Sequence, residues 1–244
     1  MVALHREKSG AMEHLQSLFE RYDRILIFDT ETTGLRFERD EIIQFSGVLL
    51  SRDGASEQYD RLIRLPPGQE VPPEIQRLTG ITTRDVQERG IPRDEAAREI
   101  AALMAGSTLL VAYNAHFDLS FLFHMLAAHG DPGCLRGKDK LDLLTVYRDR
   151  REYPHRLQNA IAAYGLEGEV QNSHQADQDA LATVRVMDAM AAERDDLEQY
   201  INLFGYIPKF GPPRRPIRSV TYLPQTYHSP VPLYRTAGGK ENRL

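Results

Sequence analysis

Asp29 and Glu31 are the first residues whose type and spacing suggest metal chemistry. They follow the apolar run Ile25 to Phe28. Side chains alternate between the two faces of a strand, so these two carboxylates are expected to share a face. Paired carboxylates repel each other and are costly to desolvate, and a hard divalent cation such as Mg²⁺ or Mn²⁺ relieves both problems. Two solvated acids at a strand end would show the same spacing.

Asp118 is the second candidate ligand. It lies in the segment Asn114-Ala115-His116-Phe117-Asp118, which follows a predicted buried strand at 107–114 and opens a predicted helix. An acid in the first turn of a helix is common for capping reasons alone. Its position after the carboxyl end of a strand is what favours a site, because binding sites of α/β sheets gather there.

The third candidate segment is HQADQDA, at the start of the last long predicted helix, with His174 and Asp179. Taken alone, His174 is typical of a surface residue beside a helix start. Asp177 competes with Asp179, but residues two apart on a helix point in different directions. Only one of these two acids is therefore expected to face the site.

The elements that must position these residues follow from the hydrophobic pattern. Three strands joined by turns predict an antiparallel meander, and the segments after it alternate between helix and strand. This order predicts a mixed α/β sheet of three antiparallel strands followed by parallel strands, with helices packed against it. The predicted strands are 24–32, 41–51, 59–65 and 107–114, the predicted helices are 74–79, 93–106, 115–130, 155–166 and 174–197, and 140–148 is mixed.

Three regions are expected along the chain: a helical N-terminal extension at 1–23, a catalytic domain at 24–197, and a C-terminal extension at 198–244 rich in Pro, Tyr and Arg. Residues 205–244 hold half of the 14 prolines and should be largely extended, with no helix continuing through them. They carry a net charge of +6 in a chain of net charge −5. An acidic body with a basic tail fits several functions.

Other features narrow the class of protein. No apolar run approaches the ~18 residues that a membrane span needs, and the N-terminal residues lack a secretory signal pattern. The only cysteine, Cys134, has no partner for an internal disulfide, and no Cys/His zinc spacing occurs. We therefore expect a cytoplasmic protein without a membrane association.

Taken together and in order, the three segments resemble the motifs of the DnaQ-like DEDDh 3′→5′ exonuclease superfamily. The resemblance spans about residues 24–195. The quoted matches are Phe28-Asp29-Thr30-Glu31-Thr32-Thr33-Gly34-Leu35 with Asp40-Glu41-Ile42-Ile43, then Leu78-Thr79-Gly80-Ile81, Asn114-Ala115-His116-Phe117-Asp118, and His174 with Asp179. The chain departs from many members at Gln44-Phe45-Ser46, where an acid and a glycine are common, and at His116, where a small residue is common.

The resemblance implies a ribonuclease H-like fold and two-metal hydrolysis of phosphodiester bonds, with Mg²⁺ or Mn²⁺ as the two divalent cations. It implies that His174 is the general base, that Asp29 bridges both cations, and that Glu31 and Asp179 complete one metal site while Asp118 holds the other. The implied substrate-binding residues are Thr32, Thr33, Leu35, Asn114 and Phe117. Phe117 is equally well explained as a core residue, His116 is expected to affect how the terminal nucleotide is held, and Asp142 is either a support for the site or a surface acid.

Three functions remain open at this point. The first is a DNA 3′→5′ exonuclease of the proofreading or repair type, and the second is an exoribonuclease that trims RNA 3′ ends. The third is an inactive nuclease fold that only binds, which the presence of all five site residues disfavours. The expected partner is a nucleic-acid 3′ end, single-stranded or frayed. The tail is a nucleic-acid-binding arm, a docking peptide for a polymerase or other protein, or a segment that packs on its own domain or is disordered.

Overall fold

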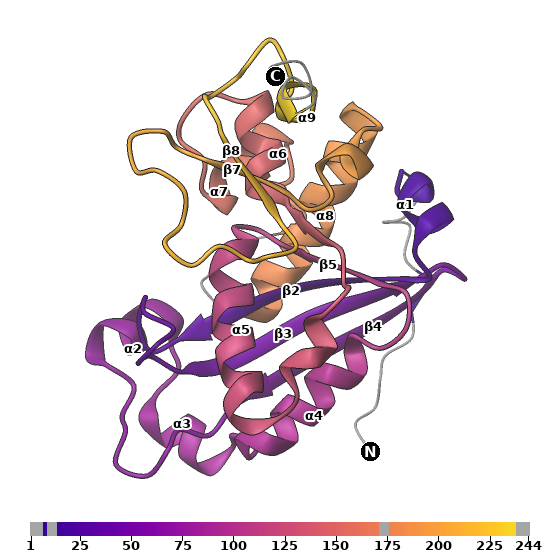
Figure 1. The fold of residues 1–244 in the computed structure, drawn as a ribbon. Helices are drawn as coiled ribbons and strands as arrows, with labels where there is room; N and C mark the ends of the chain where they lie inside the picture. The colour runs from indigo at the N-terminus through magenta and orange to yellow at the C-terminus, as the bar shows by residue number, and fades with distance from the viewer. Residues whose placement is uncertain (1–6, 9–13, 171–175, 238–244) are drawn as a thin grey trace.

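A mixed sheet of six strands forms the centre of the computed structural model, which describes residues 7–8, 14–170 and 176–237 (Figure 1). The strand order is β1-β4-β3-β2-β5-β6. The strands are β1 (Glu7–Lys8), β2 (Arg24–Thr32), β3 (Ile42–Ser51), β4 (Ala55–Leu62), β5 (Thr108–Ala112) and β6 (Lys140–Asp142). β2 pairs antiparallel with β3 and β3 antiparallel with β4, whereas β5 is parallel to both β2 and β6. The predicted α/β sheet is confirmed.

Helices cover both faces of this sheet, and the alternation of side chains along β2 shows how. Ile25 and Ile27 belong to one core cluster, with residues of α1 (Gln16–Arg21), α6 (Leu143–Arg150), α7 (Leu157–Ala163) and α8 (Ala176–Glu193). Leu26 and Phe28 belong to a second cluster, with α4 (Arg93–Leu103) and α5 (Ala115–His129). α8 therefore packs on one face of the sheet, and α4 and α5 pack on the other. None of the described helices is both long and apolar enough to cross a membrane.

Several elements differ from the sequence-based expectation. β4 spans Ala55–Leu62 instead of the expected 59–65. Its first residues are largely polar, but pairing with β3 sets the limits of the strand. α2 (Pro73–Thr79) was expected, but α3 (Thr83–Glu88) was not. Thr82 and Asp85 form a capping box that begins α3. Within residues 1–23, which were expected to be helical, the described part of the chain contains one helix, α1, and one short strand, β1.

The C-terminal segment, described to residue 237, packs on the domain. It contains the short helix η2 (Leu197–Tyr200), the parallel strands β7 (Leu203–Tyr206) and β8 (Thr221–Pro224), and the helix α9 (Leu233–Ala237). β7 and β8 are extended, as expected, whereas the short helix α9 is an element that the expectation of a largely extended tail did not include. Of the alternatives for the tail, packing against its own domain describes residues 198–237.

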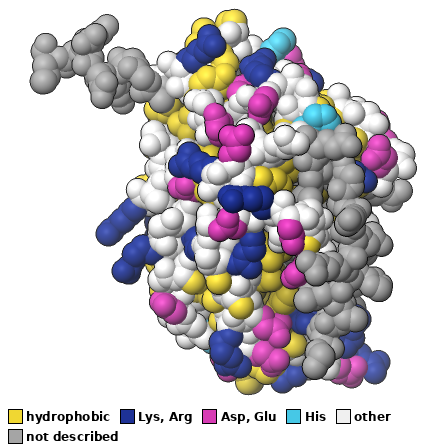
Figure 2. Space-filling view, turned by 90° about the vertical axis from the view of Figure 1, so that its right-hand side faces the viewer, with side chains coloured by type: hydrophobic (Ala, Val, Ile, Leu, Met, Phe, Trp, Pro, Cys, Tyr) yellow, Lys and Arg dark blue, Asp and Glu magenta, His cyan; other side chains and the backbone are white. Residues whose placement is uncertain are grey.

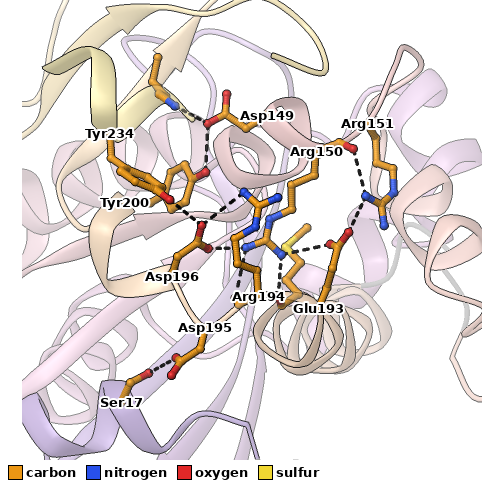
Figure 3. Close-up of polar contacts among 12 residues, drawn as sticks. Ser17, Asp149, Arg150, Arg151, Glu193, Arg194, Asp195, Asp196, Tyr200 and Tyr234 are labelled. Atoms are coloured by element: carbon orange, nitrogen blue, oxygen red, sulfur yellow. Dashed lines mark hydrogen bonds and ion pairs between the residues drawn. The ribbon is translucent and has the colours of Figure 1, made fainter. Parts of the chain in front are cut away.

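Buried polar contacts hold this segment in place (Figure 3). Asp149 is buried and accepts hydrogen bonds from the Tyr200 hydroxyl at 3.0 Å, the Gln225 amide at 2.8 Å and the Leu233 backbone nitrogen at 2.6 Å. The Arg150 guanidinium lies 2.6 Å from a carboxylate oxygen of Asp196. One acidic side chain of α6 thus connects η2, the segment after β8, and α9.

Candidate active site

Three carboxylates meet beyond the apolar part of β2. Asp29 and Glu31 continue the face of β2 that carries Ile25 and Ile27, which is the face covered by α8. Asp179 lies in the first turn of α8 and is 5% exposed. Ligand oxygens of Asp29, Glu31 and Asp179 all lie within 4.8 Å of one another. We call these three residues and Asp118 the acidic cluster.

Asp118 approaches the same place from the first turn of α5, and it is 3% exposed. Thr30, which lies between the two acids of β2, donates hydrogen bonds to one Asp118 carboxylate oxygen from its backbone nitrogen (3.1 Å) and from its hydroxyl (2.7 Å). These bonds fix the orientation of the Asp118 carboxylate relative to β2.

A pocket of about 440 Å³ opens onto the acidic cluster. All four carboxylates line it, and so do residues from the end of β5, from α6 and from the start of α7. The other lining residues are Thr30, Tyr113, Asn114, Phe117, Leu144, Arg148, His155, Arg156, Leu157 and Gln158. The sheet end, α5 and α8 therefore supply the acids, and α6 and α7 supply the opposite wall.

The electrostatics of the acidic cluster are those of crowded anions. Burial raises the pKa of Asp29 well above its usual range, and repulsion from Asp118 and its other acidic neighbours adds to this shift. Burial and repulsion from Asp179 and Asp118 raise the pKa of Glu31 to about 8. Burial also raises the pKa of Asp118 to about 7, although its hydrogen bonds from Thr30 oppose this shift. The raised pKa values of Asp29, Glu31 and Asp118 favour the protonated carboxyls when no cation is bound, and a bound cation would replace these protons.

The two acids of α8 differ in position. Asp179 lines the pocket, whereas Asp177 is neither a lining residue nor a member of the three-carboxylate group. Of the two acids, the structure thus brings Asp179 to the acidic cluster, and its role as a metal ligand stays a prediction. His174 lies outside the described residues, two positions before the first residue of α8.

Asn114 and Asp142 shape the turn between β5 and α5. Asn114 has a left-handed backbone (φ 72°), and its nitrogen and that of Ala115 donate to one Asp142 oxygen at 2.9 and 3.0 Å. Asp142 also accepts a bond from the Thr145 hydroxyl at 2.7 Å. Asp142 is thus a buried residue that supports the turn before Asp118, and it is not a surface acid.

The predicted substrate-binding residues fall into two groups. Asn114 and Phe117 line the pocket, whereas Thr32, Thr33 and Leu35 do not. The Thr33 nitrogen donates to the Glu41 carbonyl oxygen, and the Thr32 hydroxyl donates to the Gly34 carbonyl oxygen at 2.6 Å. Leu35 is 83% exposed on the loop after β2. The role of these residues in substrate binding stays a prediction.

His116 points toward the C-terminal segment. Its Nδ1 lies 2.8 Å from the Tyr222 hydroxyl of β8, and burial lowers its pKa. His116 is absent from the pocket lining. Its observed contact is therefore with the C-terminal segment, and an effect on the terminal nucleotide stays a prediction.

Sequence reasoning missed the basic and aromatic wall of the pocket. Arg148 donates to the Gly205 carbonyl oxygen at 3.3 Å, and the ring of Tyr227 lies 4.5 Å from that of His155. Arg156 is exposed at the pocket. Only the fold brings Arg148, His155 and Arg156 to the pocket of the acidic cluster, because nothing in their local sequence marks them.

Comparison with known proteins adds independent findings. Residues 26–187 match the profile of the RNase T family, described as Exonuclease. The chain is 32% identical over 168 residues to DNA polymerase III subunit epsilon of Treponema pallidum, a match that covers 68% of this chain and 75% of that protein. It is 31% identical over 161 residues to the 3′-5′ exonuclease DinG of Bacillus subtilis, covering 59% of this chain and 17% of that protein.

Solved structures show the same fold. The structure of E. coli Exonuclease I in complex with a dT13 oligonucleotide matches with a TM-score of 0.65 and 22% identity, covering 73% of this chain and 43% of that chain. The chain thus spans less than half of Exonuclease I and about a sixth of DinG. Another E. coli Exonuclease I structure is titled as the zinc-ion-bound form of its complex with single-stranded DNA.

Proposed function

Because the chain belongs to the DnaQ-like 3′→5′ exonuclease family, we propose that it hydrolyses phosphodiester bonds at the 3′ end of DNA with two divalent cations bound to the acidic cluster. The observation that carries this proposal is the convergence of Asp29, Glu31 and Asp179 within 4.8 Å at the end of β2. Family membership supports an active exonuclease over a module that only binds nucleic acid.

The acidic cluster fits divalent cations in chemistry and in charge. Carboxylate oxygens are the ligands that Mg²⁺ and Mn²⁺ prefer. The raised pKa values of Asp29 and Glu31 reflect desolvation and mutual repulsion, both of which bound cations offset. The metal ligands we propose are Asp29, Glu31, Asp118 and Asp179. When bound, a pair of cations would stabilise the attacking and leaving oxygens of an in-line displacement.

The protein's own groups would orient the reaction. Thr30 holds the Asp118 carboxylate against β2. We assign His174 as the general base that accepts a proton from the attacking water, on the strength of its position in the family motif before α8. An ordinary histidine pKa of about 6.5 suits this task near neutral pH.

The pocket wall opposite the acids supplies groups that suit a nucleotide. Arg156 is a cation at the pocket and could pair with a phosphate. The Phe117 ring lines the pocket and also packs on Phe121, with centroids 4.9 Å apart. This contact leaves Phe117 both a core residue and a candidate surface for the terminal sugar or base, with Leu35 as a second candidate on the loop after β2.

DNA is the substrate that the relatives favour. The Treponema relative is a DNA polymerase III subunit, and the Exonuclease I structure holds an oligothymidylate. We place the chain in DNA replication or repair, and its association with a polymerase is a proposal that rests on the name of that relative. RNA 3′-end trimming is the alternative, and contacts to the 2′-hydroxyl are what would distinguish the two substrates.

A nuclease assay on matched substrates tests the proposal. Single-stranded DNA, duplex DNA with a mismatched 3′ end, and RNA of the same sequence would each carry a 3′ label and be tested with Mg²⁺ and with Mn²⁺. We expect mononucleotide release from both DNAs, faster than from RNA, and its loss in Asp29→Ala and His174→Ala. Faster release from RNA would establish the alternative. No release from any substrate with either metal would contradict exonuclease activity altogether.

A further inference from the structure

A second pocket, of about 520 Å³, lies outside the acidic cluster and is lined by Arg36, Glu38, Arg39 and Arg214. We call it the basic pocket. Three of these residues, Arg36, Glu38 and Arg39, belong to the loop that follows β2. Arg214 belongs to the loop between β7 and β8, on the left of Figure 1. The basic pocket thus joins a loop next to the active site with the C-terminal segment.

The charges around the basic pocket do not cancel. Arg215 lies 3.5 Å from Glu38 and Arg39 lies 3.6 Å from Asp40, so these two acids are already paired. Arg36 and Arg214 form no side-chain ion pair with any residue that the structure describes, and both are exposed. No acidic residue occurs anywhere between 206 and 236. Two guanidinium groups are therefore available to an anionic ligand.

This arrangement differs from the charge pattern on another side of the molecule. On the side shown in Figure 2, which is the right-hand side of Figure 1, basic and acidic side chains are interspersed. The chain as a whole has a net charge of −5. A local excess of arginine on a protein of negative net charge indicates that this surface binds anions, and the protein as a whole is not expected to attract them.

A row of contacts leads to the active site from Arg215 and Phe37, which are sequence neighbours of basic-pocket residues. The Arg215 guanidinium lies 5.6 Å from the centroid of the Phe37 ring, and the Phe37 ring lies 6.3 Å from that of Phe121. Phe121 in turn packs on Phe117, which lines the active-site pocket. The basic pocket is therefore fixed to the same wall of α5 that carries Phe117 and Asp118.

The loop that carries Arg214 is anchored and also presents an aromatic side chain. Ile217 and Val220 pack in the core cluster that contains Phe37. Phe210 is 75% exposed, and the Lys209 ammonium lies 5.7 Å from its ring centroid. Cations that follow a phosphate backbone, combined with an exposed ring on which a base can stack, are the usual equipment for single-stranded nucleic acid.

We propose that the basic pocket binds the phosphate backbone of the single strand that lies 5′ of the terminal nucleotide, with Arg36 and Arg214 as the phosphate ligands. The proposal rests on the exonuclease function proposed above. It gives the C-terminal segment a role in holding the substrate, since Arg214 reaches the pocket only because β7 and β8 pack on the domain.

The test compares a long and a short substrate in the full chain. The double variant Arg36→Gln/Arg214→Gln removes both phosphate ligands, and Arg98→Gln is the matched control, an exposed arginine of α4 outside both pockets. For a twenty-nucleotide single-stranded DNA, we expect KM of the double variant to rise about tenfold or more with kcat unchanged. For p-nitrophenyl thymidine 5′-phosphate, which has no upstream phosphates, KM and kcat should match wild type.

The salt dependence gives a second readout. Each phosphate contact to a single strand contributes about 0.7 to the slope of log affinity against log salt, so the slope should fall by about 1.4 in the double variant. An unchanged KM and slope for the long DNA would overturn the proposal, and so would an equal loss on the small ester. If wild-type protein hydrolyses neither substrate, the exonuclease function fails. In that case, fluorescence anisotropy of the long DNA with Ca²⁺ decides, and equal affinity of the double variant and wild type would overturn the basic pocket's role.

Discussion

Thr30 donates two hydrogen bonds to a single carboxylate oxygen of Asp118, one from its backbone nitrogen at 3.1 Å and one from its hydroxyl at 2.7 Å. Thr30 lies between Asp29 and Glu31, so the same three residues of β2 supply two candidate ligands and hold a third. This contact ties the end of β2 to the start of α5. The geometry of the acidic cluster therefore depends on a residue whose side chain is not itself a proposed ligand.

Replacing Thr30 by valine should weaken cation binding without removing a ligand. Thr30→Val keeps the shape of the side chain and the backbone hydrogen bond but loses the hydroxyl bond, a change of about 1 kcal/mol. We expect the Mg²⁺ concentration for half-maximal activity to rise about fivefold, as measured by metal titration of nuclease activity. Thr30→Ser, which retains the hydroxyl, should restore the wild-type value. A Thr30→Val protein with wild-type metal dependence would show that the hydroxyl bond does not position Asp118.

Asp179 and Asp177 offer a matched pair on one helix. Asp179 is buried at the pocket, whereas Asp177 lies outside the pocket lining. Because cations contribute several kcal/mol to such a transition state, Asp179→Asn should lower kcat about a thousandfold or more. Asp177→Asn should keep kcat within about threefold of wild type, because a side chain away from the reacting atoms stabilises the transition state by under about 1 kcal/mol. Steady-state kinetics on single-stranded DNA measure both, and equal losses would contradict the assignment of Asp179 as the acid of α8 that serves the site.

The stability of the metal-free protein should fall as pH rises. The pKa of Glu31 is raised to about 8 in the folded chain, from an ordinary value of 4.5. The folded state therefore binds its proton more tightly than the unfolded state, and the free energy of unfolding decreases between about pH 4.5 and 8. Thermal denaturation in EDTA across this range measures the slope.

Glu31→Gln should flatten that slope, because the amide does not ionise, and added Mg²⁺ should raise the melting temperature of wild type most at the alkaline end. Asp177→Asn serves as the control and should keep the wild-type slope. Identical slopes for wild type and Glu31→Gln would mean that the ionisation of Glu31 does not strain the fold.

The C-terminal segment should contribute to stability through Asp149. Asp149→Ala leaves the buried donors of Tyr200, Gln225 and Leu233 without their acceptor. We expect the free energy of unfolding to fall by about 2–5 kcal/mol, as measured by urea denaturation. Asp195→Ala is the control (Figure 3), because Asp195 is exposed and accepts one bond, from the Ser17 hydroxyl at 2.8 Å, so its loss should cost under about 1 kcal/mol. Similar losses from both variants would argue against the buried network.

The sheet and the acidic residues could be predicted because each is marked by a local pattern. The apolar run before Asp29 and the run before Asn114 indicate β2 and β5, and the two-residue spacing of Asp29 and Glu31 places both on one face. The helix α3 was not predicted, although the capping box of Thr82 and Asp85 is a local signal for it, because this signal is weaker than hydrophobic periodicity.

The remaining parts depend on contacts between distant residues. Arg148 and His155 reach the pocket only through the packing of α6 and α7 on α8, and no spacing in the sequence encodes this. The prolines and tyrosines after residue 205 suggested an extended chain. Their folding onto the domain follows from buried polar partners such as Asp149 and Gln225, which lie 76 residues apart. The basic pocket has the same origin, because Arg36 and Arg214 come together only through the packing of the C-terminal segment.

The most direct measurement of the central claim is the product pattern from a 5′-labelled single-stranded DNA. With Mg²⁺, the wild-type protein should produce a ladder that shortens one nucleotide at a time from the 3′ end, and EDTA should abolish it. Asp29→Asn should give no ladder, while its melting temperature in EDTA stays at or above that of wild type because the amide, unlike the buried carboxyl, cannot ionise. A wild-type ladder from Asp29→Asn, or release of the 5′ label as a mononucleotide before any shortened strand appears, would contradict a 3′→5′ exonuclease built on the acidic cluster.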